Sequence, residues 1–233
     1  MIASGLPEPV IWTARVNLAI RAIARTAPAP TLPLPVTFEV LSSLVAALST
    51  QPDHLLLSAA MCLQYFACLR SAEFCADLES GVVPLRSHVS FLKPGSQLVM
   101  VYRVITSKTE SQGFTTHVGC SGHPSACAPC LMALYFSSQP RRPSAPLFVF
   151  SSGEVLTYRI YDNAIKSLVE RVGLGPTRYS THSFRAGAAT QAAAVGMPAV
   201  DIKRLGRWKS DAYQSYLRPE PIHSAAYAPR LVP

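Results

Sequence analysis

Apolar residues recur every three or four positions over most of the chain, which is the period of an amphipathic helix. Thr37, a residue type that caps helix N-termini, precedes one such run, which extends from Val40 to Leu48. The same period predicts further helices over residues 9–25, 54–69, 130–138, 157–173, 183–195 and 198–205. The segment 54–69 is apolar on nearly all sides, which predicts the central helix of the core.

The period shortens to two between about residues 86 and 119, as it does in β-strands. Alternating runs predict strands over 89–91, 97–105 and 114–118. Pro94-Gly95 and the segment 108–113 supply the turns. Three short antiparallel strands among so many helices predict an α+β fold, mainly helical, with a small three-stranded antiparallel sheet.

Prolines mark the candidate boundary near the N-terminus. Those between residues 28 and 35 favour an extended linker, since each proline fixes its own φ and constrains the preceding residue. We therefore expect residues 1–35 to form a short helix and linker, and residues 36–218 to form the main domain. The segment 219–233 is proline-rich with little helical pattern, which predicts a C-terminal tail.

Composition favours a globular domain with a polyanionic partner. The 233 residues are 49% hydrophobic and 15% charged, and a chain of this length can bury a sizeable core. The formal net charge is +8 and comes mostly from arginine. Arginine matches phosphate oxygens with two parallel hydrogen bonds, so nucleic acid is the favoured partner. A basic surface without such a partner is the simpler alternative.

The sequence predicts neither a membrane span nor a secretory signal. The most apolar run, residues 55–69, is too short to cross a bilayer. The N-terminus has no charged start followed by an apolar block. Its arginines (Arg15, Arg21 and Arg25) resemble those of a mitochondrial transit peptide, but we favour a basic helix that lies on DNA.

Six cysteines without a secretory signal indicate reduced thiols in an intracellular protein. Three of them, Cys62, Cys68 and Cys75, lie among apolar residues, where a thiol is an ordinary core side chain.

A second group follows the spacing C-x2-H-x3-C-x2-C and comprises Cys120, His123, Cys127 and Cys130. Four such ligands within eleven residues could close a tetrahedral zinc site. The alternative is a strand-to-helix connection that carries cysteines without a metal, and we expect no metal to be required.

The C-terminal half carries the densest set of candidate functional residues. His182 and Arg185 are three positions apart in the run THSFRAGAAT, so they project from one helix face. An imidazole and a guanidinium buried together need a partner, and an anion is the usual one. Tyr216 follows a basic stretch, and nearby positive charge would stabilise the phenolate, the form that attacks at neutral pH.

Two upstream segments complete an ordered series. Arg70 and Glu73 form an Arg-x-x-Glu after the central apolar run, and Lys108 lies at a predicted hairpin turn. The order Arg, Lys, His-x-x-Arg, Gly-Arg-Trp and Tyr resembles the catalytic residues of tyrosine recombinases, the phage-integrase family. The runs THSFRAGAAT and LGRWKSDAYQSY are most similar to recombinases of DIRS-type and Crypton-like mobile elements. The resemblance covers residues 36–218.

This resemblance implies the catalytic domain of a site-specific DNA recombinase or integrase that uses a 3′-phosphotyrosine intermediate and no cofactor. The implied catalytic residues are Arg70, Lys108, His182, Arg185, Trp208 and Tyr216. The two arginines would bind the phosphate, Tyr216 would attack it, and Lys108 would protonate the departing 5′ oxygen. His182 would shuttle the tyrosine proton, and Trp208 would contact the phosphate or support Tyr216.

The resemblance also implies how DNA is bound. Glu73 would hold the geometry of the site through hydrogen bonds. Basic side chains would contact double-stranded DNA, and the candidates are Lys203, Arg204, Arg207, Lys209, Arg141 and Arg142. Relatives act as tetramers on paired sites, so we expect self-association, and a mobile-element origin implies a nuclear location. Neither a membrane nor a small-molecule substrate is expected.

Several alternatives stay open. Trp208 is eight positions before Tyr216, whereas many relatives have a spacing of nine, which would select Arg207. Tyr213 is a second nearby phenol. Helices over 183–195 and 198–205 could also form a helix-turn-helix.

The N-terminal segment is much shorter than the core-binding domain of relatives, and fewer phosphate contacts weaken DNA binding. The alternative function is therefore a catalytically weak or inactive DNA-binding remnant of a mobile-element recombinase.

Overall fold

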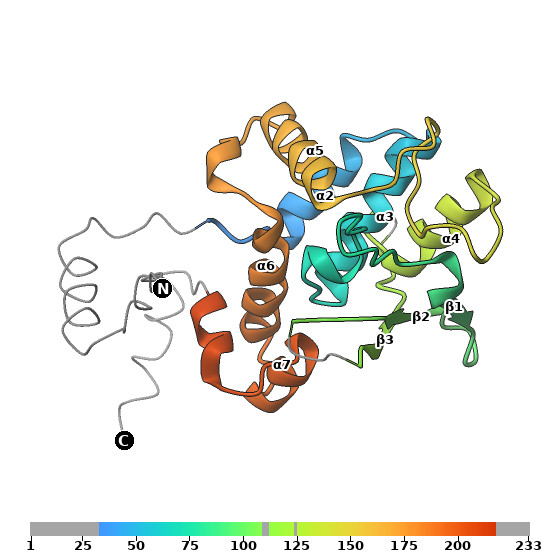
Figure 1. The fold of residues 1–233 in the computed structure, drawn as a ribbon. Coiled ribbons are helices and arrows are strands. Elements are labelled where there is room, and N and C mark those ends of the chain that lie inside the picture. Colours follow the sequence, from blue (N-terminus) through green and yellow to red (C-terminus); the bar gives the residue numbers. More distant parts are fainter. Residues whose placement is uncertain (1–32, 109–111, 124, 218–233) are drawn as a thin grey trace, which may run out of the picture. The chain divides into compact units, whose positions relative to one another are not determined.

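The computed structural model describes residues 33–108, 112–123 and 125–217, all of which belong to one compact unit. The helix expected over 9–25 and the expected tail lie outside the described residues. The elements follow in the order α2 (Phe38–Ala46), α3 (Pro52–Phe66), η1 (Ser71–Glu73), η2 (Arg86–His88), β1 (Val89–Leu92), β2 (Val99–Val104), β3 (Phe114–Gly119), α4 (Ala128–Ser138), α5 (Tyr158–Arg171), η3 (Pro176–Arg178), α6 (Thr181–Ala194), α7 (Ala199–Gly206) and η4 (Asp211–Tyr216) (Figure 1). No helix among these residues is both long enough and apolar enough to cross a bilayer.

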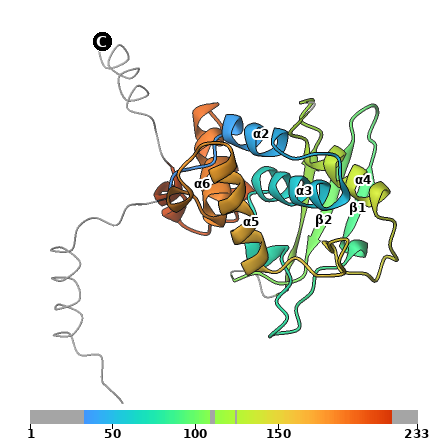
Figure 2. The same cartoon turned by 90° about the horizontal axis from the view of Figure 1, so that it is seen from above.

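Helix α3 is the centre of the core, as its apolar sequence predicts. Every residue from Leu55 to Tyr65 is buried, and the helix contacts α2, α4 and α6 (Figure 2). Pro52 occupies the first turn, where its missing N–H leaves no hydrogen bond unmade. The helix ends at Phe66, three residues before the predicted end. Cys68 then adopts a φ of +49°, a left-handed conformation that is uncommon for a residue other than glycine.

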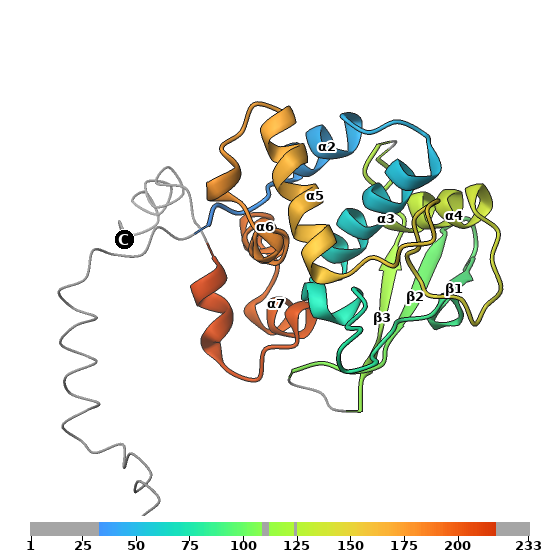
Figure 3. The same ribbon diagram turned by 45° about the horizontal axis from the view of Figure 1, so that its top comes forward.

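The three predicted strands form one antiparallel sheet in the order β1-β2-β3. Side chains along β2 alternate, so that Met100, Tyr102 and Val104 are buried while Arg103 is exposed. The sheet contacts α4, and Figure 3 shows the three strands below α3 and α4. Phe114, at the start of β3, lies against the end of α7, with its ring centre 4.2 Å from Arg207 Cζ. The prediction of a mainly helical α+β fold with a small three-stranded antiparallel sheet is confirmed.

The C-terminal helices form close to their predicted positions. Thr157 caps α5, because its hydroxyl oxygen accepts a hydrogen bond from the backbone N–H of Ile160 at 3.4 Å. Helix α6 begins at Thr181, two residues before the predicted start, and therefore includes His182. Helix α7 follows Pro198, and the short helix η4 carries Tyr216 at its end.

Helix α6 packs directly on the backbone of the extended segment before α2. The N–H of Val36 donates to the carbonyl oxygen of Ser183 at 2.9 Å. At Gly187, one turn further along, a β-carbon would lie 1.8 Å from the Val36 carbonyl oxygen. Only glycine permits this approach, which fixes α6 against the chain that enters the domain.

We expect Gly187→Ala to destabilise the domain by about 3 kcal/mol, because the added methyl overlaps backbone atoms that cannot rotate away. Helix propensity alone would have the opposite sign, about 1 kcal/mol of stabilisation. Urea unfolding measures the difference. Gly175→Ala is the matched control, since its φ is −73° and its new β-carbon would make only ordinary contacts. An unchanged free energy of unfolding for Gly187→Ala would contradict the packing argument.

Candidate active site

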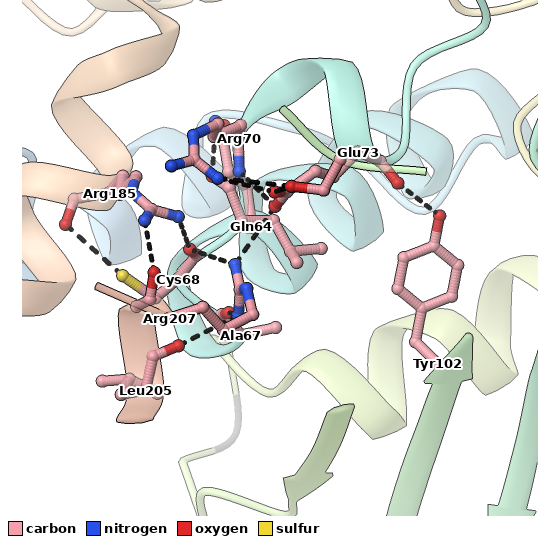
Figure 4. A network of polar contacts seen from close by, with 12 residues as sticks. Gln64, Ala67, Cys68, Arg70, Glu73, Tyr102, Arg185, Leu205 and Arg207 are labelled. Carbon is pink, nitrogen blue, oxygen red and sulfur yellow. Dashed lines mark hydrogen bonds and ion pairs between the residues drawn. The ribbon is translucent and has the colours of Figure 1, made fainter. Parts of the chain in front are cut away.

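The site is built around the turn that joins α3 to η1. Figure 4 shows side chains from α6 and from the end of α7 pointing toward this turn. Its centre is the Glu73 carboxylate, whose side chain is only 1% exposed. Glu73 accepts from the Arg70 backbone N–H at 2.8 Å, from Arg70 Nη1 at 3.0 Å and from Ser107 Oγ at 2.7 Å. Arg207 Nη2 lies 3.1 Å from the second carboxylate oxygen. One buried carboxylate thus orients two guanidinium groups.

Arg185 approaches the same turn from α6 and is fully buried. Its Nη1 donates to the carbonyl oxygen of Cys68 at 2.5 Å, and its Nη2 donates to the carbonyl oxygen of Gly206. Burial lowers the pKa of the Arg185 guanidinium from its usual value, but arginine still stays charged at neutral pH. The carbonyl oxygens therefore replace the water that this cation has lost.

Arg207 lies inside the site, although the sequence predicted it first as a DNA contact and only as an alternative to Trp208 in the catalytic set. It caps α7 with a left-handed φ of +56°, and its side chain is 14% exposed. Besides Glu73, its guanidinium bonds the carbonyl oxygens of Ala67 at 3.2 Å and Cys68 at 3.0 Å. Burial lowers the pKa of this group as well. The spacing of nine before Tyr216, which the sequence left as an alternative, selects this residue.

Trp208 and Tyr216 cover Arg185 from the other side. The Arg185 Cζ lies 4.5 Å from the Trp208 ring centre and 5.8 Å from that of Tyr216, and the two rings are 5.2 Å apart. Cation–π attraction favours this arrangement. A β-carbon at Gly206 would lie 1.8 Å from the Trp208 ring, so the ring position depends on glycine there.

Tyr213, the second phenol, lies in a different environment from Tyr216. It is buried and packs with Ala192 and Ile202 in a small apolar cluster beside the main core. Of the two tyrosines, Tyr216 is the one whose ring meets both Arg185 and Trp208.

His182 and Lys108 are both exposed. His182 lies in the first turn of α6, three residues before Arg185. Lys108 directly follows Ser107, whose hydroxyl bonds Glu73 and lies 3.4 Å from Arg70 Nη1. The chain that carries Lys108 is therefore attached to the site immediately before it, and the next described residue is Gln112.

Ser107 and Gln64 are site residues that the sequence did not predict. Gln64 Nε2 donates to the carbonyl oxygen of Thr181 at 2.9 Å, and its Oε1 accepts from the Tyr161 hydroxyl at 2.8 Å. It thus joins α3 to the start of α6. The sequence does mark Gln64 as unusual, because it is a lone amide in a run of apolar residues and a buried amide needs hydrogen-bond partners.

The proposed DNA-contacting residues fall into two places. Lys203, Arg204, Arg207 and Lys209 line an open cavity of about 390 Å³ beside Trp208. Arg141 and Arg142 instead lie in the loop 139–146, which follows α4 and is far from α7 in Figures 1 and 3. The structure does not bring these two arginines to the site.

Comparison with known proteins places the fold. Neither a family model nor a curated protein matches the sequence. Among solved structures, the XerH site-specific recombinase bound to its palindromic difH substrate in a post-cleavage complex has a TM-score of 0.62 at 14% identity. That match covers 87% of this chain and 55% of XerH, so this chain spans about half the length of that recombinase.

Two further solved structures have the same fold. The XerA recombinase has a TM-score of 0.59 at 14% identity over 93% of this chain and 75% of XerA. The Tn1549 transposon integrase in complex with circular intermediate DNA has a TM-score of 0.54 at 14% identity, over 89% of this chain and 67% of the integrase chain. The fold of this chain is therefore that of a tyrosine-recombinase catalytic domain.

We expect Glu73→Gln to lower the free energy of unfolding by about 3 kcal/mol, because removal of the buried carboxylate charge leaves two half-buried guanidinium groups without their counter-charge. Urea unfolding at neutral pH measures the loss. Glu79→Gln removes the same charge from an exposed position and is expected to change stability by less than about 0.5 kcal/mol. Equal effects of the two substitutions would show that Glu73 does not organise the site.

Proposed function

We propose that this chain is a site-specific DNA recombinase or integrase that cleaves and rejoins strands through Tyr216. The observation that carries the proposal is the convergence of Arg70 and Arg185, from distant segments, on one turn within contact of the Tyr216 ring. A helix-turn-helix reading of α6 and α7 gives no reason for this convergence. A phosphate-binding site does give a reason, because it needs several guanidinium groups in one place. The hydrogen bonds to Glu73 and to the Cys68 carbonyl oxygen hold them there.

In this proposal the guanidinium groups bind the scissile phosphate. Attack on phosphorus adds negative charge to its non-bridging oxygens, and each arginine can donate two hydrogen bonds to them. Loss of one such preorganised donor raises a barrier by about 3 kcal/mol. Arg70 is the entry point, since its side chain is 19% exposed while Arg185 is fully covered.

Residues of this chain can supply and accept every proton that the covalent step transfers. Tyr216 Oη forms a bond to phosphorus as the bond from phosphorus to the 5′ oxygen breaks. His182 accepts the phenol proton, and Lys108 gives a proton to the departing 5′ oxygen. The products are a 3′-phosphotyrosyl enzyme and a free 5′-hydroxyl. A second strand's 5′-hydroxyl reverses the step, so no energy source is consumed.

Access to Arg185 requires a local rearrangement. Its guanidinium lies under the rings of Trp208 and Tyr216, and its terminal nitrogens bond two backbone carbonyls. A phosphate accepts stronger, charge-assisted hydrogen bonds than a carbonyl does. DNA can therefore replace these carbonyl bonds once η4 shifts and the two rings move aside.

The basic cavity beside Trp208 supports contact with the DNA backbone. It is lined by Lys203, Arg204 and Lys209, next to the buried arginines. Lys203 pairs with Asp211 at 2.6 Å and Arg204 with Asp201 at 3.2 Å, so part of their charge is compensated in the free protein. Contacts of this kind make affinity fall steeply with salt.

The finer assignment is to a mobile-element recombinase of the DIRS-type or Crypton-like group. The Gly206-Arg207-Trp208 run supports it, because it resembles the Gly-Arg-Trp form of that mobile-element branch. On this assignment the chain acts in the nucleus and works as a tetramer on paired DNA sites.

The test begins with selection of bound sequences from a randomised duplex pool, since the target is unidentified. A selected site is then rebuilt with a nick beside the scissile position, so that the cleaved end diffuses away and the covalent intermediate accumulates. We expect a DNA adduct that survives SDS with the unmodified chain, and complete loss of this adduct with Tyr216→Phe.

Tyr213→Phe is the matched control, because it removes a phenol three residues away that packs in the small apolar cluster beside the main core. It should retain the adduct. Specific DNA binding with no adduct from the unmodified chain would favour the alternative, a DNA-binding remnant without activity. An adduct that persists in Tyr216→Phe would show that another residue is the nucleophile.

A further inference from the structure

Three cysteines of the connection between β3 and α4 meet at one point. The sulfur atoms of Cys120, Cys127 and Cys130 lie within 4.8 Å of one another. The separate distances are 3.4 Å between Cys120 and Cys127, 3.1 Å between Cys127 and Cys130, and 3.7 Å between Cys120 and Cys130. We refer to these three residues as the cysteine triangle.

The backbone holds the triangle from two sides. The N–H of Cys120 donates to the carbonyl oxygen of Leu98 at 2.8 Å, which continues the pairing of β2 with β3. Cys127 caps α4, and Cys130 lies in its first turn. Gly122 turns the intervening loop with a φ of +72°, and Ser121 Oγ closes it by donating to the carbonyl oxygen of Ala126 at 2.8 Å. The convergence therefore follows from well-defined elements and not from one free side chain.

The spacing of the sulfur atoms favours a metal over a disulfide. A disulfide requires a separation of about 2.05 Å, which no pair approaches. Zinc bound to thiolates at about 2.3 Å in a tetrahedron places sulfur atoms roughly 3.8 Å apart. The observed distances, from 3.1 to 3.7 Å, are all shorter than such an edge but nearer to it than to a disulfide bond. Cys127 is buried while Cys130 is exposed, so an ion could enter from solvent and still be held partly inside.

We propose that the cysteine triangle binds one thiophilic divalent metal ion, zinc in the cell, through three thiolates. This site goes beyond the proposed function and does not depend on it. Soft thiolate ligands select zinc over magnesium or calcium. The bound ion would tie the end of β3 to the first turn of α4, and α4 in turn packs on the central helix α3.

His123, the fourth residue of the sequence spacing, is not part of the proposed ligand set. Its ring packs edge-to-face on Phe38, with 4.9 Å between the ring centres. Its Nδ1 accepts from the backbone N–H of Ser125 at 3.4 Å. The proposal leaves the fourth metal position to solvent.

The test uses the full chain, reduced and stripped of metal, titrated with Co²⁺ as the spectroscopic probe. Thiolate ligation gives a near-ultraviolet charge-transfer band, and tetrahedral geometry gives intense visible absorption. We expect both to saturate at one ion per chain and to disappear on addition of Zn²⁺, which binds more tightly. Zn²⁺ should also raise the melting temperature, because it binds the folded state.

Variants decide whether the triangle is the site. Cys130→Ser changes an exposed ligand and should abolish the charge-transfer band while the circular dichroism spectrum stays unchanged. Cys75→Ala removes a thiol outside the triangle and should retain the band. His123→Ala should leave the Co²⁺ affinity within threefold of that of the unmodified chain.

Three results would overturn the proposal. The first is a reduced chain that binds no Co²⁺, and the second is a charge-transfer band that persists in Cys130→Ser. The third is a tenfold or larger loss of affinity in His123→Ala, which would replace the three-thiolate ligand set with a closed four-ligand site.

Discussion

The site depends on the placement of three arginines, one buried and two half-buried, against one acidic residue and one backbone carbonyl. A buried guanidinium without a partner is strongly unfavourable, and three arginines meet here. Glu73 supplies the counter-charge to Arg70 and Arg207, and the Cys68 carbonyl oxygen accepts from Arg185 and Arg207. Three cations against one carboxylate leave an excess of positive charge, which suits an anion such as a phosphate.

Helical and strand periods in the sequence predicted most elements, because each amphipathic segment buries the face that its period defines. They did not predict the end of α3. Its apolar run continues to Leu69, yet the helix stops at Phe66 and Cys68 turns left-handed. Local preference does not favour that conformation in cysteine. The hydrogen bonds that its carbonyl oxygen receives from two distant arginines account for it, and such bonds leave no trace in local sequence.

In the site, too, features set by neighbouring residues could be predicted from the sequence, and features set by distant contacts could not. The spacing of His182 and Arg185 on one helix was readable, because α6 is regular there. The orientation of Arg207 was not, because it follows from a positive φ at the end of α7, where glycine is the usual residue. Ser107 was missed for a related reason: an ordinary hydroxyl acquires a role only once β2 carries it to Glu73.

The closed arrangement around Arg185 also explains why small residues surround it. Gly187 lets α6 touch the entering chain, and Gly206 lets the Trp208 ring lie directly against its Cα. Larger side chains at either place would push α6 or Trp208 away from the turn at Cys68. The guanidinium would then lose the carbonyl oxygens that replace water. The close packing at Gly187 and Gly206 is therefore what keeps the buried Arg185 guanidinium hydrogen-bonded. This packing connects the fold of α6 to the chemistry that its arginine can perform.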